Sequence, residues 1–189
     1  MGKDDYVIEI HKPAAEEKLF FFLCGVITSV PLTLFFAQFT NFFLSGIDVV
    51  YATLISAAGF TPFIEEFAKA FPLFYRHGET ERSIFSLALF VGLGFGVVEL
   101  LTYTFLLGAN PIARLPGLFF HPASTSIAAY GIATKRPLPF YLVAVTLHFA
   151  HNFLAVINPS SIPFSSIITG ITVFTSWLLY RRTRKRFID

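Results

Sequence analysis

The sequence predicts an all-α protein, a polytopic membrane helix bundle with about six transmembrane helices and both termini in the cytoplasm. Three observations support this prediction. Of the 189 residues, 54% are hydrophobic and only 14% are charged, whereas soluble domains carry about 25% charged residues. Apolar stretches of about 20 residues, long enough to cross a bilayer as helices, follow one another along the chain. The cationic side chains also gather on one side of the resulting topology.

The first apolar stretch, residues 19–44, is longer than the apolar core of a signal peptide, so we interpret it as a retained first span. Five further stretches follow it, separated by short connections that contain turn-forming residues: 49–75, 83–107, 112–133, 138–157 and 163–180. Short connections favour antiparallel neighbours in one compact bundle. We therefore expect a polar cytoplasmic segment over 1–18, a single transmembrane domain over 19–180 and a basic cytoplasmic tail over 181–189.

The distribution of charge orients this bundle. With six spans, twelve of the 14 lysines and arginines fall on the side of the two termini, which the positive-inside rule makes cytoplasmic. Arg114 stands alone on the opposite side, and Lys69 lies inside a span. We interpret the basic tail as a topological anchor next to the lipid bilayer and expect no nucleic-acid partner. The single cysteine, Cys24, excludes an intrachain disulfide and a thiolate metal site.

The second apolar stretch, residues 49–75, contains Glu65, Glu66 and Lys69 and no other charged residue. Each such group costs about 2.5–3.5 kcal/mol near the centre of a membrane helix, so function is the default explanation for it. Lys69 follows Glu65 by four residues and Glu66 by three, so either carboxylate can pair with it on a helix. A structural ion pair needs only one of the two glutamates. The second carboxylate suggests water activation and proton transfer.

The next three stretches each add polar residues. Glu99 follows Gly92 and Gly96, two glycines four residues apart that allow close helix approach. His121 lies in the fourth stretch, and His148 and Asn152 share one face of the fifth. A structural hydrogen-bonding role stays open for each of these residues.

Depth along the helices is a test of whether these residues can meet. A rise of 1.5 Å per residue puts Glu65, His121 and His148 near mid-depth, with Glu99 roughly 9 Å closer to the opposite face. We expect a polar cluster at mid-depth that a water-filled cavity connects to that face.

Four motifs therefore occur in order on successive stretches: Glu65-Glu66-x-x-Lys69, Phe95-x-x-x-Glu99-x-x-x-Tyr103, His121-x-x-x-Thr125 and His148-x-x-x-Asn152. Over residues 50–155 this pattern resembles the PrsW family of intramembrane proteases. It is similar, more remotely, to the type II CAAX prenyl endopeptidases and bacteriocin-processing proteins. The resemblance implies a helical protease in the plasma membrane of a prokaryote that cleaves membrane-associated protein substrates.

On this basis we expect peptide-bond hydrolysis by an activated water, with Glu65 as general base and Glu66 or Lys69 adjusting its charge. His121 would position the water or protonate the leaving amine. Oxyanion stabilisation would come from His148 and Asn152. Glu99 would orient a histidine or bind a metal.

The need for a metal stays open at this point. Zinc could be held by two histidines and carboxylates, from the set Glu66, Glu99, His121 and His148. No His-Glu-x-x-His pair is present, so the sequence does not require zinc.

Two other classes of protein also fit an intramembrane polar cluster. One is a proton-coupled transporter, because the same residue types build proton relays, although no internal repeat is visible. The other is a non-catalytic scaffold that grips a partner helix.

Overall fold

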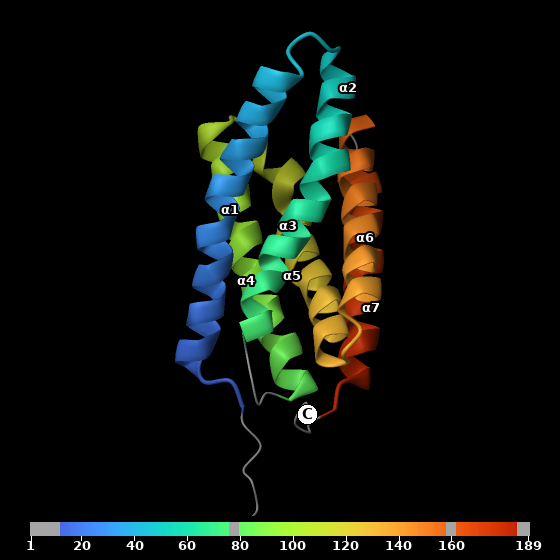
Figure 1. Cartoon of the computed structure of the whole chain (residues 1–189). Coiled ribbons are helices and arrows are strands. Elements are labelled where there is room, and N and C mark those ends of the chain that lie inside the picture. Colours follow the sequence, from blue (N-terminus) through green and yellow to red (C-terminus); the bar gives the residue numbers. More distant parts are fainter. Residues whose placement is uncertain (1–11, 76–79, 158–161, 185–189) are drawn as a thin grey trace, which may run out of the picture.

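A computed structural model describes residues 12–75, 80–157 and 162–184 of the chain. Within these ranges the chain is a bundle of helices without a β-strand (Figure 1), which confirms the all-α prediction. Residues 1–11 of the expected N-terminal segment and residues 185–189 of the basic tail lie outside the described ranges.

Each apolar stretch corresponds to one helical segment in the described part of the chain. The second segment is composite, with a π-helical turn (η1) and a 3₁₀ turn (η2), and the third ends in a second π-helical turn (η3). The elements in chain order are α1 (Ala15–Phe43), α2 (Val49–Thr53), η1 (Leu54–Phe60), α3 (Thr61–Ala70), η2 (Phe71–Tyr75), α4 (Glu81–Leu101), η3 (Thr102–Leu106), α5 (Pro111–Ala133), α6 (Pro137–Ile157) and α7 (Ile162–Arg182).

Two of the described helical segments, Glu81–Leu106 and Pro137–Ile157, are long and apolar enough to cross a membrane by length and composition. The beginning of α4 and the end of α7 lie together, because Glu81 accepts a hydrogen bond from the backbone of Arg184 at 2.8 Å. Figure 1 shows the beginning of α1 at the same end of the bundle. This shared end is called the terminal end below, and the other is called the distal end.

Glycines allow α4 to pack closely between α1 and α5. A Cβ atom on Gly94 would lie 2.0 Å from the carbonyl oxygen of Phe22 in α1. One on Gly92 would lie 2.5 Å from the carbonyl oxygen of His121 in α5. Neither position accepts a side chain unless the helices separate, which confirms the predicted close approach at Gly92. In Figure 1 the α2–α3 rod lies in front of α4 and α5, with α1 on one side and α6 and α7 on the other.

Candidate active site

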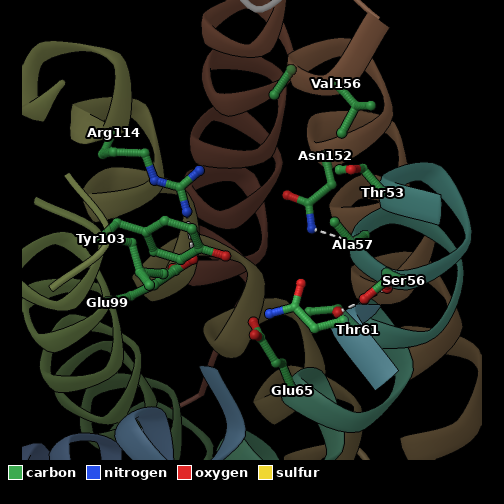
Figure 2. A pocket seen from close by; sticks show the side chains of 13 residues that line it. Thr53, Ser56, Ala57, Thr61, Glu65, Glu99, Tyr103, Arg114, Asn152 and Val156 are labelled. Atoms are coloured by element: carbon green, nitrogen blue, oxygen red, sulfur yellow. Dashed lines mark hydrogen bonds and ion pairs between the residues drawn. The ribbon is translucent and has the colours of Figure 1, made fainter. Parts of the chain in front are cut away.

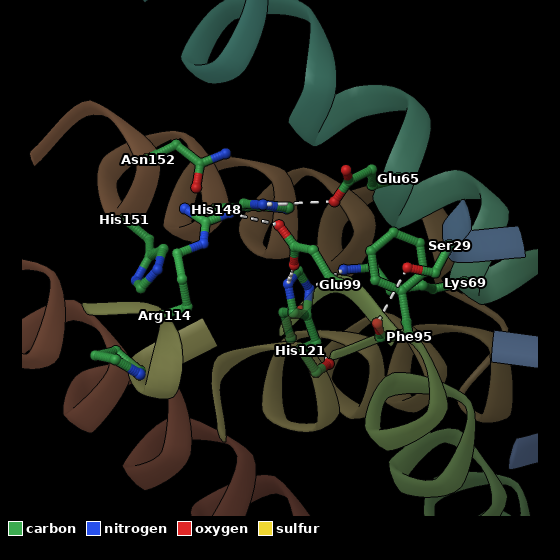
Figure 3. Close-up of polar contacts among 12 residues, drawn as sticks. Ser29, Glu65, Lys69, Phe95, Glu99, Arg114, His121, His148, His151 and Asn152 are labelled. Atoms are coloured by element: carbon green, nitrogen blue, oxygen red, sulfur yellow. Dashed lines mark hydrogen bonds and ion pairs between the residues drawn. The ribbon is translucent and has the colours of Figure 1, made fainter. Parts of the chain in front are cut away.

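The seven polar residues proposed from the sequence come from four helices and gather around one buried cluster and the cavity next to it (Figure 3). Helix α4 provides Glu99, and α5 provides His121. The remaining residues come from α3 (Glu65, Glu66, Lys69) and α6 (His148, Asn152). Glu99 and Asn152 are partly exposed, and the other five are at most 3% exposed.

Glu66 is the hub of the cluster. Its Oε1 atom accepts hydrogen bonds from Lys69 Nζ at 2.6 Å, from His148 Nδ1 at 2.8 Å and from Ser124 Oγ at 3.0 Å. Hydrogen bonds to a carboxylate are stronger than those between neutral groups. Three helices, α3, α5 and α6, are thus fastened to one oxygen atom.

A second line of contacts runs from Lys69 through His121 to Glu99. Lys69 Nζ donates to His121 Nδ1 at 3.0 Å, and an ammonium group can only donate. His121 Nδ1 is therefore the acceptor, and Nε2 carries the proton that it donates to Glu99 Oε2. The other carboxylate oxygen of Glu99 accepts from Arg114 Nη2 at 3.1 Å.

The contact between Glu99 and His121 differs from the depth expected from helix rise alone. The backbone of His121 is level with Gly92, while a Cβ atom on Gly96 would lie 3.4 Å from His121 Cδ2. Side chains tilt toward the N-terminus of their helix, and the N-terminus of α5 lies at the distal end. The imidazole therefore reaches toward Glu99 across the space that Gly96 leaves open.

Glu65 stands apart from this network. Its Oε2 atom is buried and has no hydrogen-bond partner among the described residues. The nearest ring nitrogen is His148 Nε2, at 3.8 Å. Because His148 Nδ1 donates to Glu66, Nε2 of a neutral imidazole carries a lone pair on the side that faces Glu65. A carboxylate and a basic nitrogen thus face each other across a gap.

A cavity of about 340 Å³ begins at Glu65 and extends toward the distal end. Glu99, Tyr103 and Arg114 form one wall, and Thr61, Ala57 and Asn152 form the opposite wall (Figure 2). This lining is polar and joins the buried cluster to the end of the bundle away from the termini.

Asn152 is tied to the π-helical turn η1. Its Nδ2 atom donates to the carbonyl oxygen of Ala57 at 2.7 Å. In the π-helical register, shown by the bond from Thr61 N–H to the Ser56 carbonyl, the donor for Ala57 would be Pro62. Proline has no N–H. The amide of Asn152 thus replaces the missing donor and holds η1 against α6.

Among the residues that the structure describes, one group of side chains could hold a metal ion. Ligand atoms of Glu65, His121 and His148 all lie within 4.8 Å of one another, and all three residues are buried. Glu65 Oε2 has no hydrogen-bond partner in the described part of the chain, and His148 donates its other ring N–H to the carboxylate of Glu66, as metal-binding histidines usually do. The set proposed from the sequence differs, because it contained Glu66 and Glu99 and not Glu65. In the structure Glu66 and Glu99 accept hydrogen bonds from His148 and His121, and Glu65 provides the third ligand atom.

Comparison with protein-family models decides the class. The model of the PrsW family of intramembrane metalloproteases matches residues 16–180. The chain belongs to the PrsW family. It is therefore a membrane-embedded protease. Comparisons with curated proteins and with solved structures gave no significant match.

Sequence reasoning missed two residues of this candidate site, Arg114 and Ser124. Arg114 was interpreted only as a topological exception, yet its guanidinium carbon lies 3.5 Å from the centroid of the Tyr103 ring and its Nη2 reaches Glu99. The available signal was that Arg114 is the single cation on the non-cytoplasmic side of the expected six-span topology. Ser124 was not proposed, although its hydroxyl donates to Glu66. Its position on the turn after His121 was the available signal.

Proposed function

We propose that this protein is an intramembrane endopeptidase in which Glu65 activates the hydrolytic water. The observation that carries the proposal is the isolation of Glu65: its buried Oε2 has no hydrogen-bond partner among the described residues and faces the lone pair of His148 Nε2 at 3.8 Å. A general base needs a carboxylate within reach of water and not engaged by a protein donor. The cavity that begins at Glu65 would supply both water and the peptide.

Glu66 and Lys69 act by leaving Glu65 free. Lys69 pairs with Glu66 at 2.6 Å, so the Glu65 carboxylate does not have to neutralise the Lys69 ammonium. Glu66 also fixes the His148 ring through Nδ1, which keeps Nε2 directed at Glu65. In this proposal Glu66 and Lys69 are positioning residues, and Glu65 is the residue that touches the water.

The reaction follows from these positions. As the water oxygen attacks the scissile carbonyl carbon, one of its protons passes to the Glu65 carboxylate. The carbonyl becomes an oxyanion, which the second N–H of Asn152 and a proton-carrying histidine would stabilise. The C–N bond breaks when a proton is delivered to the amine nitrogen, by Glu65 or through His148 or His121. Two polypeptide ends result, and the carboxylate is regenerated.

A divalent cation such as zinc is the cofactor that the family description implies. Glu65, His121 and His148 would hold it, and Glu65 would then serve as a metal ligand in place of a free general base. When bound, such an ion polarises a carbonyl group and makes water a better nucleophile near neutral pH. When all three glutamates of the cluster are ionised and its histidines are neutral, the glutamates exceed the two cations, Lys69 and Arg114, by one negative charge, and an added cation would balance it.

His121 limits how such an ion could bind. Both of its ring nitrogens are engaged, one by Lys69 and one by Glu99. Ligation through His121 therefore requires one of these two contacts to open.

We extend the proposal to topology and domain organisation. Residues 19–180 would form one transmembrane domain of six spans, flanked by the cytoplasmic segments 1–18 and 181–189, in the plasma membrane of a prokaryote. The match of the family model over 16–180 and the two apolar helical segments support this arrangement. Reporter fusions after residues 45, 109 and 189 would test it. Cytoplasmic signals from 45 and 109 would contradict it.

The decisive experiment compares purified wild type with Glu65→Gln on single-span membrane proteins. Wild type should release discrete fragments and Glu65→Gln should not, while both proteins melt at similar temperatures. Cleavage by Glu65→Gln at the wild-type rate would reject Glu65 as the base.

The metal is tested separately by elemental analysis of the purified protein. Tightly bound zinc that is lost in His148→Gln but kept in Arg181→Gln, which alters a residue at the terminal end, would support the metal site. Full cleavage activity in protein free of metal would reject a metal requirement.

A further inference from the structure

The positive charge of Arg114 does not stabilise its own helix, α5. It lies in the first turn of α5, close to the positive end of the helix dipole, where cations are disfavoured. It is also 30% exposed, and it lines both the main cavity and a small adjoining void of about 40 Å³ that His121 and His151 border. Its position therefore needs an explanation outside α5.

Two contacts fix the guanidinium. Its carbon lies 3.5 Å from the centroid of the Tyr103 ring, which is a stacked cation–π arrangement. Its Nη2 atom donates to Glu99 Oε1 at 3.1 Å. The π-helical turn η3 carries Tyr103 just beyond the end of α4, so ring and carboxylate reach Arg114 from the same segment. The guanidinium is thus held on one face and at one edge (Figure 2).

The partner of Arg114 is the residue that holds His121. Glu99 uses Oε1 for Arg114 and Oε2 for His121 Nε2, so the carboxylate bridges the two side chains. The Glu99 side chain is 16% exposed toward the cavity and could otherwise turn into it. Without Glu99, the His121 imidazole would keep only the hydrogen bond that Lys69 donates to its Nδ1 atom.

We propose that Arg114 is a positioning residue of the active site, which holds Glu99 against His121 and thereby fixes one tautomer and one orientation of the imidazole. The inference rests on the proposed function, because it assigns Arg114 to the site that cleaves the peptide. Partners of this kind, which orient a site residue without touching substrate, typically change affinity or rate by about 10- to 100-fold when removed.

The kinetic test separates positioning from substrate binding. Arg114→Gln should lower kcat by about 10- to 100-fold and leave KM within about twofold. Arg114→Lys restores a positive charge without the planar fork, so its kcat should lie between those of Arg114→Gln and wild type. A raised KM with unchanged kcat in both variants would overturn the proposal, because it would mean that Arg114 binds the substrate.

A double substitution tests whether Arg114 acts through Glu99. If it does, Arg114→Gln should add less than about twofold to the loss already caused by Glu99→Gln. Multiplication of the two losses would overturn the proposal. Arg82→Gln is the matched control: Arg82 also lies against a ring, with its guanidinium carbon 4.7 Å from the Tyr180 centroid, and also donates hydrogen bonds, but at the terminal end. Its kcat should match that of wild type.

A spectroscopic readout keeps the two proposals distinguishable. In ¹⁵N-histidine-labelled protein, the signals that disappear in His121→Gln report the tautomer of His121. Wild type and Arg82→Gln should give a single Nε2–H tautomer, whereas Arg114→Gln should give a mixture or broadened signals. An unchanged Nε2–H tautomer in Arg114→Gln would overturn the role of Arg114 even if the protein cleaves its substrate. Wild type without proteolysis but with the expected spectra would overturn the proposed function alone. If Arg114→Gln does not fold, the same comparison is made with Arg114→Lys.

Discussion

Replacement of Lys69 by methionine tests the buried charge network most directly. The side chain is 0% exposed, its ammonium lies 2.6 Å from Glu66 Oε1 and 3.0 Å from His121 Nδ1, and it sits 5.0 Å from the centroid of the Phe95 ring. Methionine fills a similar volume but leaves Glu66 without its cation. Removal of one partner of a buried ion pair costs about 3–5 kcal/mol, because the other charge stays buried without compensation.

The assay is thermal unfolding in detergent of Lys69→Met, Glu66→Gln and the double variant. For a chain of this size, a loss of about 3–5 kcal/mol lowers the midpoint by roughly 6–20 °C. The double variant leaves neither charge behind, so its loss should be smaller than the sum of the two single losses. Lys18→Met is the matched control, because the Lys18 ammonium lies 6.0 Å from the Phe90 ring centroid but is only partly buried. Its midpoint should change by no more than about 2 °C.

Two outcomes would refute this reasoning. A melting temperature of Lys69→Met within about 2 °C of wild type would mean that Glu66 carries no buried charge in need of Lys69. Alternatively, the two single losses could add in full in the double variant, which would mean that the two side chains do not interact energetically at their 2.6 Å separation.

Three further predictions concern single residues. Glu65→Gln should lower kcat by about 10²- to 10⁴-fold, as measured by substrate cleavage, with little change in melting temperature because Oε2 has no partner among the described residues. Gly92→Ala should destabilise the protein by about 1–3 kcal/mol in thermal unfolding, because its Cβ would lie 2.5 Å from backbone atoms of α5. Gly170→Ala should not destabilise the protein, because a Cβ atom on Gly170 has no neighbour within 4 Å. Asn152→Leu leaves the Ala57 carbonyl without its donor at a cost of about 1–3 kcal/mol, and hydrogen exchange over residues 57–62 should become faster. Unchanged exchange there would contradict the anchoring role of Asn152.

The helices could be predicted closely because apolar length is a property of the sequence itself. The stretch 112–133 was expected and α5 runs from Pro111 to Ala133, since proline and the Asn110 cap mark its beginning. The π-helical turns could not be predicted, because a π turn differs from an α turn by one residue in hydrogen-bond register and leaves no change in apolar pattern. The bond from Asn152 to Ala57 depends on that register, so it was equally invisible in the sequence.

The role of Arg114 shows a different limit of the sequence. Arg114 lies on another helix from Glu99, across a connection, and no spacing rule joins two residues on separate helices. Its charge was noticed, but a positive-inside count treats every cation as equivalent. Only the packing of α4 against α5, which Gly92 and Gly96 permit, brings the guanidinium to the carboxylate.

Glu65 and Glu66 are adjacent in the sequence, but only Glu66 pairs with Lys69 in the structure. Adjacent residues on a helix point about 100° apart, so one lysine on that helix cannot engage both carboxylates equally. The structure selects the i,i+3 partner: Lys69 binds Glu66, and this leaves Glu65 on the cavity wall. Had Lys69 paired with Glu65, its ammonium N–H groups would occupy the carboxylate oxygens that we assign to the proton of the water. The spacing that left two alternatives open in the sequence therefore yields, in the folded bundle, one carboxylate paired with Lys69 and one carboxylate without a hydrogen-bond donor among the described residues.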